Sequence, residues 1–142
     1  MPRTSLVPFV LLAGLAACAA PPPPPKVSVE QPYFSEEGVG SWYGRSHQGK
    51  TTADGERFNM RAFTAAHRSL PFDTVLRVTN LDTGQKVKVR VNDRGPYVGG
   101  RIIDLSDAAA KALGMHEDGI AHLRLEAFAS DQALPRSVNL GR

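Results

Sequence analysis

The sequence predicts a small all-β domain with one or two short helices. From Gly38 onward, short runs rich in Val, Thr and aromatic residues are separated by Gly, Pro, Asn and Asp, a pattern typical of strands and turns. Several of these runs alternate apolar with polar residues. The 142 residues, 42% of them hydrophobic and 22% charged, suffice for one hydrophobic core. We therefore expect a single domain, preceded by a segment that does not belong to it.

The first residues indicate export. Arg3 precedes an apolar run from Leu6 to Leu15, and the small residues Ala16 and Ala17 follow. This run is shorter than the roughly 20 apolar residues that a membrane-spanning helix needs. We expect residues 1–17 to be a signal peptide.

Cys18, the single cysteine, closes the string Leu15-Ala16-Ala17-Cys18. This string resembles a bacterial lipobox, in which the thiol is acylated; the alternative is a cysteine without consequence in a leader. The resemblance implies a lipoprotein, held on a membrane by acyl chains such as palmitate on Cys18 and facing the periplasm of the cell envelope. Because Ala19 follows, and not Asp, the outer membrane is favoured over the inner. One cysteine forms no intramolecular disulfide, so packing must stabilise the domain.

Residues 18–37 have the composition of a tether. Five consecutive prolines occupy positions 21–25, and a polar stretch continues to Glu37. Such a segment favours extended polyproline II and cannot bury a core. We expect a linker between the acylated cysteine and the domain.

The expected domain, residues 38–129, contains a hairpin signal. The segments 75–79 and 86–91 alternate apolar with polar residues, and Asn80, Asp82 and Gly84 between them favour a turn. The alternation predicts that the side chains of Val87, Val89 and Val91 point inward.

A short helix and a last strand follow. Residues 106–113 read as a helix with Ser106 or Asp107 as N-cap and Gly114 as its end. Residues 121–128 alternate again, and we expect residues 130–142 to be a frayed tail.

Charge and histidine spacing argue against several functions. The net charge of +3 is scattered among acidic residues, and neither a basic recognition helix nor a stacking strand is visible, so we expect no nucleic-acid partner. His47, His116 and His122 lack metal-ligand spacing. We expect neither a metal nor another cofactor.

Four strings carry a family resemblance. They are Gly-Val-Gly-Ser-Trp-Tyr-Gly at 38–44, Thr-Thr-Ala-Asp-Gly-Glu-Arg-Phe at 51–58, Asn-Asp-Arg-Gly-Pro at 92–96 and Arg-Ile-Ile-Asp-Leu-Ser at 101–106. Together they resemble the RlpA family of rare lipoprotein A-like septal ring lytic transglycosylases, from Gly38 to about Phe128. The resemblance implies a six-stranded double-psi β-barrel, shared with expansins, and a polysaccharide groove. Relatives often carry a C-terminal SPOR domain, for which we expect no room after Phe128.

Glu56 and Asp93 are the first catalytic candidates. A turn at Asp54-Gly55 places Glu56 at a loop edge, although its residue type alone favours a solvated charge. Asp93 ends an apolar strand, and the residues alone leave open an Asx-turn or an ion pair with Arg94. The resemblance makes both carboxylates catalytic.

Asp104 and His67 are further catalytic candidates. Asp104 lies between Ile103 and Leu105, where desolvation would raise its pKa and let it hold a proton, although it could equally cap the helix near residue 106. His67 is catalytic by resemblance alone, because a lone histidine is more often structural.

Trp42, Tyr43 and Arg94 are candidates for substrate binding. Aromatic rings pack on the apolar faces of sugars, but in an alternating strand only one of Trp42 and Tyr43 can point outward. The pattern leaves open which one.

The resemblance implies an endolytic lytic transglycosylase that works as a monomer on peptidoglycan glycan strands. It would cleave between MurNAc and GlcNAc, leave 1,6-anhydroMurNAc ends and prefer glycans that lack stem peptides. Glu56 or Asp93 would protonate the leaving oxygen, and the other carboxylate would stabilise oxocarbenium-like charge. The alternatives are a non-catalytic, expansin-like lipoprotein that binds peptidoglycan or loosens the wall, and an inhibitor or scaffold of other wall enzymes.

Overall fold

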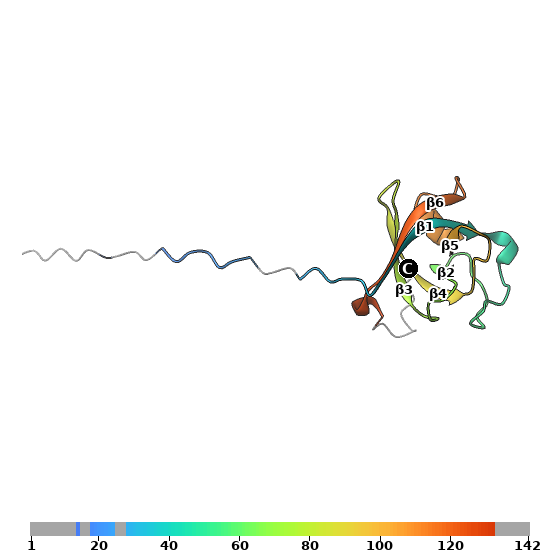
Figure 1. Ribbon diagram of the computed structural model, residues 1–142, viewed down its shortest axis with the longest axis horizontal. Helices are drawn as coiled ribbons and strands as arrows, with labels where there is room; N and C mark the ends of the chain where they lie inside the picture. Colours follow the sequence, from blue (N-terminus) through green and yellow to red (C-terminus); the bar gives the residue numbers. More distant parts are fainter. Residues whose placement is uncertain (1–13, 15–17, 25–27, 133–142) are drawn as a thin grey trace, which may run out of the picture.

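The computed structural model describes Gly14, residues 18–24 and residues 28–132. The expected signal peptide, apart from Gly14, and most of the expected tail lie outside these residues. Six strands form a closed barrel in the order β1-β5-β2-β4-β3-β6 (Figure 1). The strands are β1 (Phe34–Tyr43), β2 (Thr64–Ala66), β3 (Val75–Asn80), β4 (Lys86–Asp93), β5 (Arg101–Ser106) and β6 (Ile120–Ala127). The predicted six-stranded all-β fold is confirmed.

The barrel contains both parallel and antiparallel strand pairs. β1 pairs with β5 and β2 with β4 in parallel, whereas the remaining neighbours are antiparallel. The described helical segments are α1 (Asp107–Ala112) and the 3-10 turns η1 (Arg45–His47) and η2 (Ala129–Asp131). None of the helices in the described part of the chain has the length and apolar character to span a membrane.

The barrel begins at Phe34, ahead of the boundary expected at Gly38. Phe34 packs against the core and pairs with Ala127, and Glu37 pairs with Arg124 of β6. The intervening side chains are polar because they alternate between a partly buried and an exposed face. Their polar composition suggested a linker that ends at Glu37, whereas the first strand of the barrel already begins at Phe34.

The hairpin and the helix form where the sequence predicts them. Val78 pairs with Val87, and Val89 and Val91 are fully buried. Ser106 caps α1, since its hydroxyl accepts a hydrogen bond from the Ala109 N–H. Six of the fully buried branched residues in the core come from the three strands β4, β5 and β6: Val89, Val91, Ile103, Leu105, Leu123 and Leu125.

The three-residue strand β2 lies between β5 and β4 in the barrel. It pairs in parallel with β4 on one side and antiparallel with β5 on the other. All three of its residues are buried. β2 thus fixes the distance between the ends of β4 and β5, where two of the predicted site residues lie.

Candidate active site

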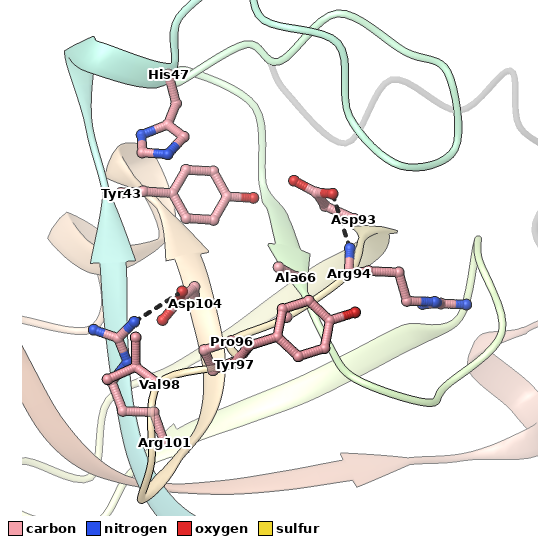
Figure 2. Close-up of a pocket in the computed structure, with 11 residues that line it drawn as sticks. Tyr43, His47, Ala66, Asp93, Arg94, Pro96, Tyr97, Val98, Arg101 and Asp104 are labelled. Carbon is pink, nitrogen blue, oxygen red and sulfur yellow. Dashed lines mark hydrogen bonds and ion pairs between the residues drawn. The ribbon is translucent and has the colours of Figure 1, made fainter.

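A cavity of roughly 320 Å³ opens at this end of the barrel (Figure 2). It is lined by residues of β1, β2, β4 and β5, by η1 and by the loop between β4 and β5. The lining residues are Tyr43, His47, Ala66, Asp93, Arg94, Gly95, Pro96, Tyr97, Val98, Arg101 and Asp104. Its volume matches the lower end of typical small-molecule sites.

Ala66 lies between the two acidic residues of this cavity. It pairs with Asp93 of β4 and with Asp104 of β5. Since neighbouring strands are about 4.8 Å apart, the Cα atoms of the two aspartates are separated by roughly 10 Å. The methyl side chain of Ala66 leaves the space between the carboxylates open to a ligand.

Asp93 is held through one of its two carboxylate oxygens. Its Oδ1 accepts hydrogen bonds from the backbone N–H groups of Ala53 at 2.9 Å and Arg94 at 2.8 Å. Its Oδ2 has no hydrogen-bond partner among residues 28–132, which the structure describes. The side chain is therefore fixed in direction and keeps one oxygen available.

Asp104 is held by charged and polar donors. The Ser41 hydroxyl donates to Oδ1 at 2.7 Å, and the Arg101 guanidinium lies 3.4 Å from Oδ2. The side chain of Asp104 is 15% exposed. Both contacts fix the direction of the Asp104 carboxylate. Ser106 is the N-cap of α1, so Asp104 does not occupy the helix-cap position that the sequence left open.

Trp42 and Tyr43 point to opposite sides of β1, as the alternation predicts. Trp42 packs against the core and stacks on His116 with a centroid distance of 4.2 Å. Tyr43 lines the cavity, and its ring packs against Phe58 and His47 at 4.7 and 4.9 Å. Of the two aromatic candidates, Tyr43 is the one at the site.

The sequence reasoning missed Tyr97. This residue belongs to the loop between β4 and β5, lines the cavity and is 77% exposed. Its ring is thus an open surface on which a sugar can pack. An aromatic residue in the string Gly-Pro-Tyr-Val-Gly-Gly, directly after Asp93 and Arg94, was the available signal.

Arg94 lines the cavity, but its charged group is engaged elsewhere. The guanidinium lies 3.9 Å from the ring centroid of Phe72 and donates to the His67 carbonyl. Figure 2 shows it directed away from the Asp93 carboxylate. The ion pair between the side chains of Asp93 and Arg94, one of the alternatives that the sequence left open, is absent among the described contacts; the Arg94 backbone N–H donates to the Asp93 carboxylate instead.

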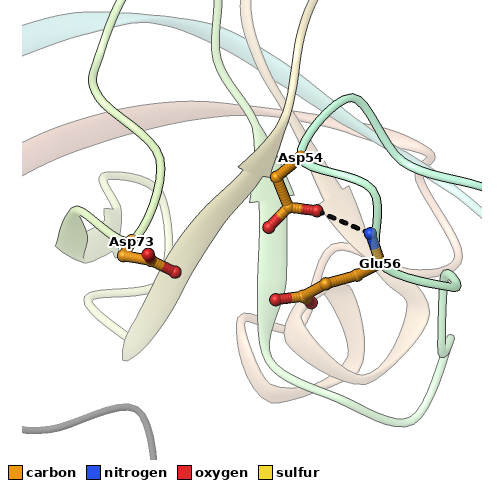
Figure 3. Close-up of side chains that lie close together, drawn as sticks. All are labelled: Asp54, Glu56 and Asp73. Atoms are coloured by element: carbon orange, nitrogen blue, oxygen red, sulfur yellow. Dashed lines mark hydrogen bonds between the residues drawn. The ribbon is translucent and has the colours of Figure 1, made fainter.

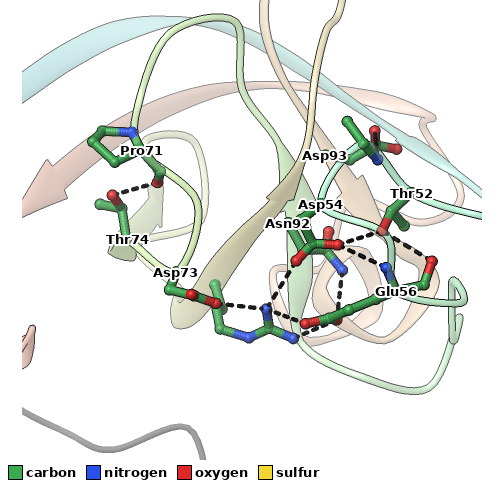
Figure 4. Close-up of polar contacts among 10 residues, drawn as sticks. Thr52, Asp54, Glu56, Pro71, Asp73, Thr74, Asn92 and Asp93 are labelled. Atoms are coloured by element: carbon green, nitrogen blue, oxygen red, sulfur yellow. Dashed lines mark hydrogen bonds and ion pairs between the residues drawn. The ribbon is translucent and has the colours of Figure 1, made fainter.

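Glu56 lies outside the cavity lining, in a second cluster with Asp54 and Asp73 (Figure 3). The Arg90 guanidinium donates to both Glu56 carboxylate oxygens at 2.8 Å (Figure 4). This pair holds the pKa of Glu56 below its usual range. The loop of Glu56 nevertheless contacts Asp93, because the Ala53 N–H donates to it.

The same cluster contains the only described group of acidic residues close enough to share a cation. One carboxylate oxygen of each of Asp54, Glu56 and Asp73 lies within 4.8 Å of the others. Arg90 already contacts all three, at 3.7, 2.8 and 3.2 Å. A metal ion would have to displace this guanidinium, so the donor set fits an arginine better than a metal.

His67 is 4% exposed and does not line the cavity. Its Nδ1 accepts hydrogen bonds from the backbone N–H groups of Ser69 and Leu70 at 3.2 and 3.1 Å. Its Nε2 lies 3.3 Å from Glu36, which assigns the imidazole proton to Nε2. Both ring nitrogens are occupied. The His67 backbone N–H donates to the Asp93 carbonyl at 3.2 Å, but the imidazole does not line the cavity that Asp93 and Asp104 share.

Comparison with known proteins identifies the class of this barrel. A family model described as lytic transglycolase matches residues 35–125. In structure, the chain is similar to an expansin of Clavibacter michiganensis solved with cellohexaose, with a TM-score of 0.56 and 22% identity over 72% of this chain and 54% of the expansin. The protein is thus a double-psi β-barrel of the lytic transglycolase class.

Closer relatives specify the family. The chain is 49% identical to the endolytic peptidoglycan transglycosylase RlpA of Neisseria meningitidis over 75% of its own length, and 53% identical to that of Campylobacter jejuni over 63%. The chain belongs to the RlpA family. It spans 44% and 33% of the lengths of these two relatives.

Proposed function

We propose that this domain cleaves peptidoglycan glycan strands as an endolytic lytic transglycosylase. The observation that carries the proposal is the pair of aspartates on either side of Ala66, with Asp93 and Asp104 facing one cavity. Family membership and the names of the relatives support the reaction type.

Asp93 is the general acid in this proposal. Its Oδ2 has no partner in the described part of the chain and can meet the leaving oxygen, whereas both oxygens of Asp104 are engaged by Ser41 and Arg101. Glu56 fits the acid role less well, because a carboxylate bound to Arg90 through both oxygens has no proton to give. The proposal therefore favours Asp93 over Glu56, the two acids that the sequence left open.

The proposed reaction is intramolecular. Asp93 gives its proton to the oxygen that links MurNAc to the next GlcNAc, and the bond from that oxygen to the MurNAc C1 breaks. The C6 hydroxyl oxygen of the same MurNAc bonds to C1, and its proton passes to the Asp93 carboxylate. Asp104 stabilises the positive charge that develops at C1. The products are a free GlcNAc hydroxyl and a 1,6-anhydroMurNAc end.

The cavity also explains how a glycan strand could be held. The exposed Tyr97 ring offers a face for sugar packing, in the place that the sequence assigned to Trp42 or Tyr43. Glycans that lack stem peptides remain the expected preferred substrate, because a strand without peptide branches meets fewer clashes in a cavity of this size.

We further propose that the protein is a monomeric lipoprotein of the cell envelope, anchored through Cys18 in the outer membrane. Cys18 is exposed, while residues 15–17 of its lipobox-like string lie outside the described residues. Labelled palmitate should be incorporated into the wild-type protein and not into Cys18→Ala. Equal labelling of both would contradict the anchor.

The test of the reaction uses purified full-length protein, peptidoglycan sacculi and sacculi stripped of stem peptides. Mass spectrometry of the released fragments should find anhydro ends with the wild type and none above background with Asp93→Asn. Asp82→Asn is the matched control, because it makes the same change at an exposed hairpin residue outside the cavity. If folded wild-type protein sediments with sacculi and releases nothing, the domain is an expansin-like glycan binder.

A further inference from the structure

The hydroxyl of Tyr43 is a buried polar group without a partner. Its oxygen is buried, and no atom in the described part of the chain makes a hydrogen bond to it. Most buried hydroxyls in proteins are hydrogen-bonded, because leaving one unpaired lowers stability. An exception at the end of a strand that lines a ligand-sized cavity calls for an explanation from function.

The surroundings of this hydroxyl indicate a hydrogen-bond donor. Figure 2 shows the Tyr43 ring extending from β1 into the cavity, with the hydroxyl directed toward the side of Asp93. Burial, and then the charges of Asp93 and Asp104, raise the pKa of Tyr43 above its usual value. The hydroxyl therefore keeps its proton at neutral pH and can donate a hydrogen bond.

The ring of Tyr43 is not available for stacking. It already packs against Phe58 and His47, which come from the segment after β1. The group of this side chain that is left without a partner is the hydroxyl. This differs from the stacking role that the sequence suggested for Tyr43.

We propose that Tyr43 contacts the substrate through its hydroxyl, which donates a hydrogen bond to a sugar oxygen lying between Asp93 and Asp104. The assignment rests on the proposed glycan cleavage for its substrate class. The hydroxyl completes a set of three polar groups around one reacting sugar. Asp93 supplies the proton, Asp104 the negative charge, and Tyr43 a neutral donor that fixes the orientation of the ring.

Tyr43→Phe tests this inference, because it removes one oxygen and keeps the ring packed on Phe58 and His47. A hydroxyl that serves only a ligand contributes nothing to folding, so the melting temperature should stay the same or rise. The rate of release of anhydro ends, as kcat/KM, should fall about ten-fold, which corresponds to the loss of one hydrogen bond in the transition state. Tyr33→Phe is the matched control, since Tyr33 is 59% exposed and does not line the cavity.

Two readouts separate this inference from the proposed reaction. Sedimentation of each variant with sacculi measures glycan binding whether or not cleavage occurs. If the wild type releases no anhydro ends, the proposed reaction fails, and weaker sedimentation of Tyr43→Phe than of Tyr33→Phe still supports the contact. Tyr43→Phe that equals the wild type in both kcat/KM and sedimentation overturns the inference. So does a fall in melting temperature that accounts for the lost activity, because the hydroxyl would then be structural.

Discussion

Arg90 binds both carboxylate oxygens of Glu56, with Nη1–Oε1 and Nη2–Oε2 distances of 2.8 Å. The same guanidinium contacts Asp54 and Asp73. Asp54 in turn accepts a hydrogen bond from the Glu56 N–H and one from the Thr52 hydroxyl. This network fixes the loop whose Ala53 N–H positions Asp93. Glu56 is thereby connected to the cavity through the backbone of its own loop.

The pH dependence of cleavage should not depend on the titration of Glu56. Because Arg90 lowers its pKa, Glu56 is ionised above its ordinary value of about 4.3 and loses its charge only as the pH falls through the lower folded value. Glu56→Gln should reduce kcat/KM at every pH between about 5 and 8 by the same factor, leaving the midpoints of the curve unchanged. Measuring kcat/KM against pH for the wild type and for Glu56→Gln tests this prediction. If the mutation displaces a midpoint of the pH curve, Glu56 is the titrating acid.

Arg90→Lys should reproduce much of the Glu56→Gln defect. Lysine keeps the charge but cannot donate to both carboxylate oxygens in parallel, so the loop loses its fixed position. We expect kcat/KM to fall several-fold and the double variant to be little worse than either single one, as for residues of one network. Kinetics of the four proteins give this comparison. If the fold-reductions in kcat/KM of the two single variants multiply in the double variant, Arg90 and Glu56 act independently and the shared network is contradicted.

His67 should prove to be structural. Its Nδ1 accepts the N–H groups of Ser69 and Leu70, and His67→Asn can retain that acceptor whereas His67→Gln places its oxygen further out. Leaving these N–H groups unpaired costs about 1–3 kcal/mol each where they are buried. Urea unfolding should therefore rank the wild type first, then Asn, then Gln. Folded His67→Asn with no detectable cleavage would restore the catalytic role implied by the family resemblance.

Asp131 should stabilise the C-terminal end of the barrel in a pH-dependent way. It accepts from Arg77 of β3 at 2.5 Å and Lys88 of β4 at 2.7 Å, and these contacts hold the pKa of Asp131 below its usual range. Asp131→Asn should lower the free energy of unfolding by about 2 kcal/mol at neutral pH. The stabilisation is complete above about pH 4 and is lost as the pH falls through the lower folded pKa. Unfolding curves of the wild type and of Asp131→Asn should be measured at pH 7 and at pH 3. The difference in the free energy of unfolding between the two proteins should be far larger at pH 7 than at pH 3.

Local signals correctly predicted the hairpin, the short helix and the last strand. The alternation of the segment around Val89 and the capping pattern at Ser106 act within a few residues, and tertiary packing agrees with both. The start of β1 was missed because Ser35, Glu36 and Glu37 are polar, and their strand conformation depends on pairing with β6, nearly ninety residues away. Position in the chain cannot reveal such a pairing.

The composition of the site was predictable only in part. Asp93 and Asp104 could be chosen from the family strings, but that both flank Ala66 follows from the order of three strands that are not consecutive. The ion pair of Glu56 depends on Arg90, an alternating residue of β4 that resembles any solvent-facing cation in sequence. Long-range partners of this kind set which carboxylate is free to hold a proton, and no local pattern encodes them.

The site depends on the complete barrel, because it needs the pairing of β2 with both β4 and β5. Asp93 and Asp104 belong to β4 and β5, which are joined through the three residues of β2. The two aspartates therefore come together only after β2 has paired with both strands. A chain in which either pairing is open has both aspartates but does not bring them to one cavity. The cavity and the folded barrel are therefore acquired in the same event, because the two aspartates share one cavity only once β2 has paired on both sides.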